Sequence, residues 1–428
     1  MPDCLFLSHP QPRDSGDYQH RVMLPGRALA VHLPVAEMQT SHPAYLAHGL
    51  AAGLLVVKMV ADPAVLGLIE ARRALGRATA FEISDDFRDF PPSLPGHGFY
   101  AQPANQSLIE ESARRADMVQ FSSHGLAHKY AALNSRHAVL PNQLEQVPLL
   151  SPLSPERLGQ PVIGWAGSAG HLDDARQLAA WLRPWYGARR RAGLQVPPLR
   201  VMAPDRVAAA FLTAGLPASV VAPARFEAYL DFLTSLDIGI AVLGDTDFAR
   251  GRSDGKFLEY ASRGVVCVAS AAGEYLHGVR HGETGLLFRS ADELADRLSA
   301  LVDDPSQRLR LRAAAHTHVG QERNHPRAAL GRARLYRELA PGLAPAGSGA
   351  LESVVDASED RFLQATTLHM AGRIHDALDG YLAVASAHPG FHEPWARSAL
   401  IARTVGATRD ADLFERMAQQ ALRTNLHA

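Results

Sequence analysis

Short apolar segments alternate with amphipathic stretches through the first three quarters of the chain. The apolar segments are continuous and rich in Val, Ile and Leu, which is typical of strands buried on both faces of a parallel sheet. The strands expected in the first part are residues 28–32, 54–60, 79–83, 118–121 and 138–140. The helices expected between them are residues 44–52, 64–75, 106–115 and 125–134. This alternation predicts βαβ units in a doubly wound α/β sheet.

A polar, proline-rich segment interrupts the pattern at residues 142–161, with the sequence NQLEQVPLLSPLSPERLGQP. The alternation then restarts. The strands expected there are residues 162–167, 199–202, 219–221, 238–243, 265–269 and 286–288, and the helices are 172–191, 226–236, 253–263 and 324–339. We therefore expect two facing Rossmann-like domains, residues 1–150 and 161–340, with ligands between the carboxyl ends of their strands.

The last part of the chain has a purely helical pattern. It follows PGLAPAGSGA, residues 341–350, whose composition is typical of a linker. Gly372 and Gly406 recur at a 34-residue interval, as do Ala377 and Ala411, which resembles the tetratricopeptide period. The alternative is an ordinary pair of helical hairpins. We expect a helical extension over residues 351–428 that is dispensable for donor binding and offers a surface to a protein partner or the acceptor.

Composition excludes several classes of protein. Of 428 residues, 47% are hydrophobic and 20% charged, so disorder is not expected. The net charge of −1 argues against a general nucleic-acid binder. The two cysteines, Cys4 in an expected N-terminal tail and Cys267 in an apolar run, exclude a disulfide scaffold and a cysteine-based zinc site.

Targeting signals are not apparent in the sequence. No apolar run reaches the roughly 18 residues of a transmembrane segment, and the N-terminus is too polar and proline-rich for a signal peptide. We expect a cytoplasmic protein, with peripheral association at the inner membrane face as an option.

The segment RSDGKFLEYASRG, which begins at Arg252, carries the most informative chemistry. Ser253 or Asp254 is suited to capping a helix, and the N-terminus of that helix suits a phosphate. Lys256 adds a positive charge in the first turn. Glu259, one turn further on, shares its face and is suited to binding a diol such as a ribose. The alternative is a surface Lys–Glu pair.

Other candidates follow predicted strands. The glycine-containing turn at Gly167 and Ser168 would let phosphates approach closely, or is only a tight strand-to-helix turn. Asp85 ends a predicted strand, where it suits acceptor binding or base catalysis, or caps a turn. His124 begins the next helix and is either a ligand or a helix-start residue. Thr284 lies in another glycine-containing turn, which is equally a plain turn.

Several of these segments occur in an order that resembles a known family. KFLEYASRGVVCVAS, followed by GEYLHGVRHGETGLLF, resembles the carboxy-terminal half of retaining glycosyltransferases of family 4, which have the GT-B fold. VIGWAGSAGHLDD resembles the first strand and loop of the same domain. ADMVQFSSHGLAHKYAALNSRHAVLPNQLE and FEISDDFRDFPP resemble segments of the amino-terminal domain. The resemblance covers residues 20–335.

The resemblance implies a function. It implies a nucleoside-diphosphate-sugar donor, bound as a substrate by the carboxy-terminal domain without a cofactor or a metal. It also implies a glycan, lipid-linked or protein acceptor on the amino-terminal domain, and transfer with retention of anomeric configuration. By this resemblance Glu259 matches the second acid of an E-x7-E motif, which contacts the donor ribose.

The sequence departs from the family at two places. The first acid of the motif falls on Gly251, and Asp245, Asp247 or Asp254 could substitute for it. The family's Arg…Lys phosphate pair is also missing after the first strand, where Ser168 and His171 stand instead. Lys256, with Arg252 or Arg250, is the remaining positive charge for the diphosphate.

The sequence thus predicts a set of site residues. The expected catalytic residues are Lys256, Asp85 and His124, and the expected donor-binding residues are Gly167, Ser168, Arg252, Lys256, Glu259 and Thr284. Two alternatives stay open: a GT-B nucleotide-sugar epimerase, and a degenerate, non-catalytic GT-B scaffold. Gly251 favours the scaffold, whereas Lys256 and Glu259 favour an enzyme.

Overall fold

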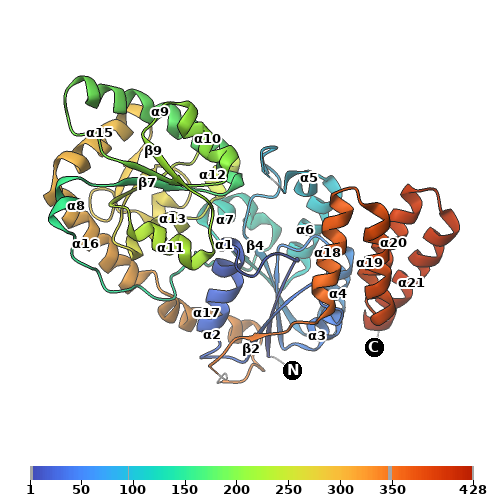
Figure 1. Cartoon of the computed structure of the whole chain (residues 1–428). Coiled ribbons are helices and arrows are strands. Elements are labelled where there is room, and N and C mark those ends of the chain that lie inside the picture. The colour runs from blue at the N-terminus through green and yellow to red at the C-terminus, as the bar shows by residue number, and fades with distance from the viewer. Residues whose placement is uncertain (1–2, 95, 346–348, 427–428) are drawn as a thin grey trace.

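The computed structural model describes residues 3–94, 96–345 and 349–426. It folds them into two α/β domains and a helical tail (Figure 1). Each domain is built on one parallel sheet, so the predicted fold class is confirmed. Figure 1 shows the two sheets beside one another, with the tail at the far end of the N-terminal domain.

The N-terminal domain contains a seven-stranded parallel sheet in the order β13-β2-β1-β3-β4-β5-β6. Its strands are β1 (Cys4–Ser8), β2 (Val35–Gln39), β3 (Leu54–Lys58), β4 (Ala78–Ile83), β5 (Met118–Phe121), β6 (His137–Val139) and β13 (Glu352–Ser353). Its helices are α1 (Gly16–Tyr18), the π-helix η1 (Gln19–Met23), α2 (Leu24–Leu29), α3 (Tyr45–Ala51), α4 (Pro63–Ala74), α5 (His97–Tyr100), α6 (Pro103–Arg115), α7 (His124–Tyr130) and η2 (Ala131–Leu133).

The beginning of the chain differs from the prediction. Cys4 lies in β1, a fully buried strand between β2 and β3, and not in a tail. The predicted strand 28–32 is instead the end of α2 and a turn, and Val31 is 61% exposed there. The missed strand β2 carries a buried Glu37, which interrupts its apolar pattern. That carboxylate is satisfied by Arg13 at 3.0 Å and by Tyr18.

The C-terminal domain contains a six-stranded parallel sheet in the order β12-β11-β10-β7-β8-β9. Its strands are β7 (Ile163–Ala166), β8 (Leu199–Met202), β9 (Ala218–Val221), β10 (Ile238–Ala241), β11 (Val266–Ser270) and β12 (Leu286–Phe288). Its helices are α8 (Pro155–Gly159), η3 (Ala169–His171), α9 (Leu172–Arg191), α10 (Asp205–Thr213), α11 (Phe226–Thr234), α12 (Asp247–Gly251), α13 (Gly255–Ser262), α14 (Tyr275–Gly278), α15 (Ala291–Asp303) and α16 (Pro305–Glu322). Every strand predicted for this half is present.

The chain crosses between the domains twice. The first crossing follows β6, and the second leads from α16 into α17 (His325–Leu339), which packs on α2 of the N-terminal domain. The two crossings are hydrogen-bonded to each other. The N–H of Leu144 donates to the carbonyl oxygen of Arg323 at 3.0 Å, and the N–H of His325 donates to that of Leu144 at 2.7 Å.

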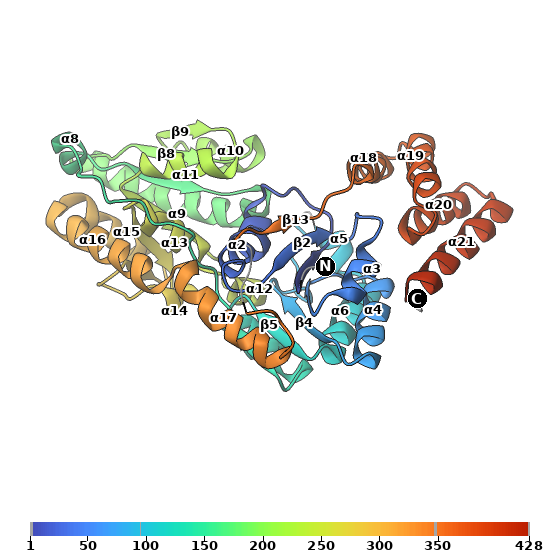
Figure 2. The ribbon, with the colours of Figure 1, turned by 90° about the horizontal axis from the view of Figure 1, so that it is seen from below.

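The tail consists of α18 (Ser358–Met370), α19 (Ile374–Ala387), α20 (His392–Thr404) and α21 (Thr408–Leu426). Gly372 and Gly406 have φ values of 76° and 80° in the turns between paired helices, as their shared spacing suggests. The tetratricopeptide character of these pairs stays a prediction. Figure 2 shows the tail beyond α3 and α4, on the side away from the C-terminal domain.

The tail is not a loosely attached extension. β13 adds a strand to the edge of the N-terminal sheet beside β2, and α21 packs on α3 and α4. Phe362, Tyr381 and Phe391 are buried in the same hydrophobic core as β1, β3 and β4. Although residues 341–350 have the composition of a linker, the tail that follows them shares the sheet and the core of the N-terminal domain. Within the described residues, no helix combines the length and the apolarity that a bilayer crossing needs.

Candidate active site between the two domains

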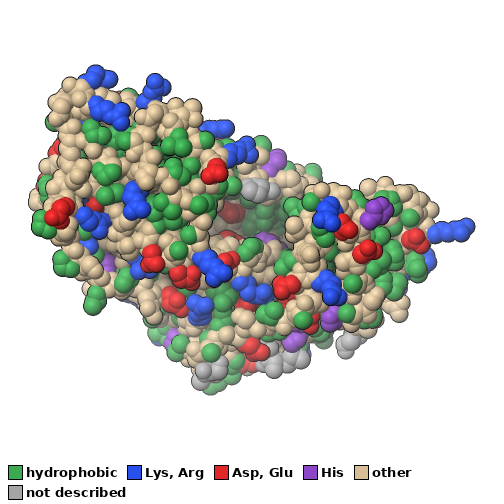
Figure 3. Space-filling view, in the orientation of Figure 1, with side chains coloured by type: hydrophobic (Ala, Val, Ile, Leu, Met, Phe, Trp, Pro, Cys, Tyr) green, Lys and Arg blue, Asp and Glu red, His purple; other side chains and the backbone are tan. Residues whose placement is uncertain are grey.

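Segments that follow the carboxyl ends of β5 and β10 meet between the two domains. Figure 3 shows the surface hollowed between the two lobes. Hydrogen bonds join the domains here. They include His20 Nε2 with Glu259 Oε1 at 2.9 Å, Ser123 Oγ with the carbonyl oxygen of Gly251 at 2.7 Å, and His124 Nδ1 with Glu274 Oε1 at 2.8 Å. The predicted site residues can be placed relative to these contacts.

A cationic cluster forms on the C-terminal side. Lys256 Nζ and Arg252 Nη2 each lie 3.2 Å from Nε2 of His171. Because both cations can only donate hydrogen bonds, Nε2 accepts, and the proton of the ring is on Nδ1. Nδ1 lies 2.8 Å from Asp174 Oδ2, which fixes the ring. Burial, and then the charge of Lys256, lowers the pKa of His171 to about 3, so the ring is neutral and holds the two cations together.

Gly167 has a steric reason to be glycine. A Cβ atom at this position would lie 2.3 Å from Cη2 of Trp165 and 3.0 Å from Cβ of His171. The backbone after β7 therefore passes directly over the Trp165 ring, and Lys256 Nζ lies 5.9 Å from the centre of that ring. Ser168, the next residue, is exposed and precedes η3. The predicted donor-binding residues Gly167, Arg252 and Lys256 are thus brought together.

Glu259 is buried at the rear of this cluster, and both of its oxygens have partners. Oε1 accepts from His20 of η1, across the domain boundary, and Oε2 accepts from Tyr229 Oη at 2.6 Å. The carboxylate takes these bonds from His20 and Tyr229, not from Lys256, so the alternative of a surface Lys–Glu pair does not describe it.

The position of the missing acid is a point of close contact between the domains. A Cβ atom on Gly251 would lie 2.9 Å from Leu126 Cδ2 of α7, and one on Gly125 would lie 1.9 Å from the carbonyl oxygen of Arg250. α7 and α12 therefore pack backbone to backbone. An acidic side chain at position 251 does not fit between them in this arrangement.

The three aspartates considered as substitutes lie elsewhere. Asp254 is fully buried and forms a bidentate pair with Arg323 at 2.7 and 3.0 Å, so it does not cap α13 as expected. Asp245 and Asp247 are exposed and both pair with Arg250. Arg250 thus forms ion pairs with exposed aspartates at the surface, whereas Arg252 lies beside His171 in the cleft.

The two neighbouring aspartates of the N-terminal domain have different environments. Asp86 is buried and organises its loop: it pairs with Lys129 at 2.5 Å, and the hydroxyl of Tyr130 donates to it. Asp85, directly after β4, lies nearer the donor domain. Burial raises the pKa of the Asp85 carboxyl, and the charge of Arg252 is the largest opposing influence. Asp85 therefore lies close enough to Arg252 for the two charges to interact.

His124 and Thr284 are committed to contacts within the protein. His124 is the first residue of α7; its backbone N–H and its ring both bond to the buried Glu274, and the ring stacks on His277 at 4.3 Å. The Thr284 hydroxyl accepts from the N–H of Arg280 at 2.9 Å within the turn before β12. His124 joins the two domains, and Thr284 shapes a turn.

The sequence did not predict a second set of polar residues, which lies at the carboxyl ends of β1 and β3. Lys58, which interrupts an apolar run, is buried and pairs with Asp17 at 2.6 Å. Burial, and then the charge of Lys58, lowers the pKa of His9 to about 4. Met59, the next residue, has a φ of 45°, a strained conformation for a residue other than glycine. The location of these groups at the strand ends is typical of a binding site.

Comparison with known proteins agrees with this architecture. Residues 188–329 match a family described as "Glycosyl transferase-like". No curated protein matches the chain by sequence. Similar solved structures include Anabaena HepE in complex with UDP and glucose (TM-score 0.58, 14% identity, 79% of this chain and 100% of that one). They also include sucrose-phosphate synthase from Thermosynechococcus elongatus (0.59, 13%, 79% and 99%) and a glycosyltransferase from Rickettsia africae (0.56, 12%, 80% and 99%). Similarity at this identity establishes the GT-B fold.

Proposed function

We propose that this protein transfers a sugar from a nucleoside-diphosphate sugar to a glycan, lipid-linked or protein acceptor, with retention of anomeric configuration. The observation that carries the proposal is the pair of cations, Lys256 and Arg252, held on the neutral His171 beside the turn at Gly167. The family matched by residues 188–329, and the UDP and glucose bound to HepE, support a nucleotide-sugar donor.

The cationic cluster suits a departing nucleoside diphosphate. Negative charge develops on the leaving group as the bond to the sugar breaks, and preorganised charges at that point lower the barrier. Lys256 and Arg252 are held by Nε2 of His171 before any ligand binds, so little reorganisation is needed. Gly167 lets the backbone after β7 pass close to Trp165 and His171, which places this turn beside the two cations.

The nucleoside end of the donor fits behind this cluster. Glu259 and Tyr229 present a hydrogen-bonded carboxylate and hydroxyl, a combination that suits the two hydroxyls of a ribose. The donor would displace His20 from Glu259, so binding is coupled to the separation of the domains at this contact.

The acceptor would bind on the N-terminal side. Asp85 lies opposite Arg252, and burial raises its pKa, which favours a carboxyl group that can take a proton from an acceptor hydroxyl. Lys58 and Asp17 supply further polar groups at the same edge of the sheet. Asp85 is the catalytic residue that we assign to this domain.

Gly251 favours a second candidate function. The acid that family members place at this position is replaced by glycine, which packs against Leu126. A GT-B domain that binds a nucleotide sugar without turning it over would have the same structure. The two candidates differ in whether bound donor is consumed.

A donor-hydrolysis screen tests the proposed function. The full chain is incubated with a panel of nucleotide sugars, and released nucleoside diphosphate is measured. We expect one donor to be hydrolysed slowly without an acceptor. Nucleotide binding by calorimetry without release from any donor would instead favour the non-catalytic candidate, and epimerised donor would favour an epimerase.

Retention of configuration is checked on the product of the donor identified in this way. A proton NMR spectrum of freshly formed product should show the anomeric coupling of the donor sugar. An inverted coupling in the first minutes of reaction would refute the retaining mechanism.

The affinity for a nucleoside diphosphate should fall about tenfold between pH 7 and pH 9. Burial, and then the charge of Arg252, lowers the pKa of Lys256 to about 8, so the charged form prevails below this pH and is lost above it. The last phosphate proton has already left at pH 7, so the nucleotide itself does not change. Calorimetry at several pH values measures the effect.

The control for this experiment is Lys256→Arg, whose guanidinium keeps its charge at pH 9. Its binding should vary less with pH than that of the wild type. A wild-type affinity that stays constant to pH 9 would contradict the role of Lys256.

A further inference from the structure

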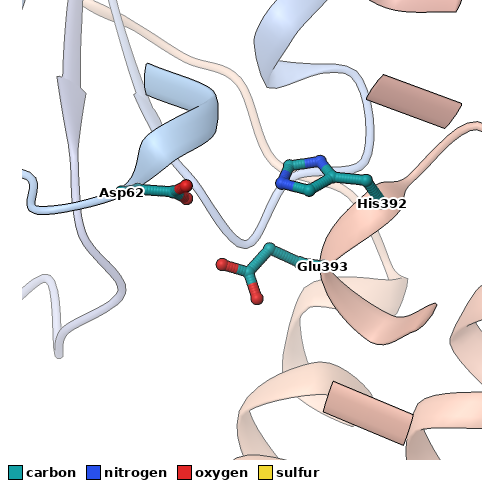
Figure 4. A group of neighbouring side chains, drawn as sticks. All are labelled: Asp62, His392 and Glu393. Carbon is teal, nitrogen blue, oxygen red and sulfur yellow. The ribbon is translucent and has the colours of Figure 1, made fainter. Parts of the chain in front are cut away.

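A cluster of metal-ligating side chains lies where the tail meets the N-terminal domain, apart from the cleft. Asp62 precedes α4, and His392 and Glu393 begin α20 (Figure 4). One potential ligand atom from each residue lies within 4.8 Å of the other two. Figure 4 shows the His392 ring turned toward the two carboxylates, with a nitrogen at its near side.

His392 has the properties of a metal ligand. It is only 5% exposed, and its ring forms no hydrogen bond among the described residues. The ring nitrogen that lies nearest the two carboxylates is the one further from Cβ (Figure 4). Its ring lies against Tyr45, with the centres of the two rings 5.9 Å apart. A buried imidazole that forms no hydrogen bond is uncommon in folded proteins and calls for an explanation.

The two carboxylates retain capacity for a further ligand. Asp62 Oδ1 caps α4 by accepting from the N–H of Ala64 at 2.8 Å, and Oδ2 lies 3.5 Å from Tyr45 Oη. Glu393 pairs with Arg397 at 3.1 Å, and its side chain is 18% exposed, which leaves a path from solvent. Two acids thus share a site with one cation, Arg397.

We propose that Asp62, His392 and Glu393 bind one divalent transition-metal ion that clamps the tail onto the N-terminal domain. Imidazole and carboxylate ligands suit Zn²⁺, which commonly takes three protein ligands and a water molecule. The two carboxylates of Asp62 and Glu393 carry more negative charge than Arg397 balances, and the ion would add two positive charges there. Because Asp62 belongs to one element and His392 and Glu393 to another far along the chain, the ion links residues that only the folded tail brings together.

The first experiment adds ZnCl₂ to the full chain after removal of metal with a chelator. Calorimetry should give one Zn²⁺ per chain, and the melting temperature should rise with Zn²⁺ concentration. Co²⁺ in place of Zn²⁺ should give a visible absorption band from the bound ion. Failure of the wild type to bind Zn²⁺ at a one-to-one ratio would overturn the proposal.

Variants then locate the bound ion. His392→Ala should weaken Zn²⁺ binding by at least the roughly 10–100-fold that even an outer-shell change costs. His375→Ala, a change of an exposed histidine on α19, is the matched control and should bind as the wild type does. Equal Zn²⁺ affinity in His392→Ala and the wild type would show that the ion binds elsewhere.

A second variant keeps the test decisive if His392→Ala does not fold. Asp62→Asn retains a side-chain oxygen that caps α4, but it loses the charge that attracts the ion. This variant should have the wild-type circular dichroism spectrum and weaker Zn²⁺ binding. A folded Asp62→Asn protein with unchanged Zn²⁺ affinity would refute the site.

Discussion

Replacement of Lys256 by alanine is expected to lower the rate of sugar transfer by about 10²–10³-fold. It should also weaken nucleoside-diphosphate binding by about 1.5–3 kcal/mol, the cost of a lost hydrogen bond to a charged group. Lys256 is half-buried, and its ammonium group is held by His171 next to Arg252. Its charge is therefore screened less by solvent than that of a surface lysine.

The control for this variant is Arg250→Ala, in the preceding helix α12. Arg250 is exposed and pairs with Asp245 and Asp247, so its removal should change activity little. Steady-state kinetics and calorimetry on both variants, with circular dichroism to check folding, make the comparison. Wild-type affinity for the nucleotide in Lys256→Ala would remove this residue from the donor site.

Truncation of the chain after Pro341 should make the protein aggregate or lose its cooperative melting transition. The cut removes β13 from the sheet edge and takes Phe362, Tyr381 and Phe391 out of the N-terminal core. Each large side chain lost from a core costs about 3–5 kcal/mol, whereas a whole domain is stable by only about 5–15 kcal/mol. Solubility, thermal melting and light scattering measure the outcome.

A point substitution on the outer face of the tail provides the comparison. Met370 is 86% exposed, and Met370→Gln should leave the melting temperature unchanged. A soluble truncated protein with normal donor hydrolysis and reduced transfer would contradict this expectation and favour a recruiting role for the tail.

Most strands of the C-terminal domain could be predicted because they are short, mainly apolar runs between polar segments, as in β11 and β12. β2 could not, because its buried Glu37 is neutralised by Arg13, from another part of the chain. The position of the tail could not be predicted from the sequence pattern either. The apolar face of an amphipathic helix indicates that the helix packs against something, but not against which surface.

In the candidate site too, some residues could be predicted from local sequence signals and others could not. Lys256, Arg252 and Gly167 could be proposed because a helix start and a glycine turn have local sequence signals. His20, Tyr229 and Glu274 were missed, since each gains its role from a residue far away in sequence. Single histidines and glutamates carry no local signal of such contacts.

The two crossings between the domains limit how the cleft can open. Because Leu144 is hydrogen-bonded to both Arg323 and His325, the two connections meet at one place. A sliding motion of one domain over the other would break these bonds, whereas a rotation about the line through them would not. Rotation about this line is therefore the motion that we expect to open the cleft. It would separate the contacts that His20, Ser123 and His124 make with the C-terminal domain.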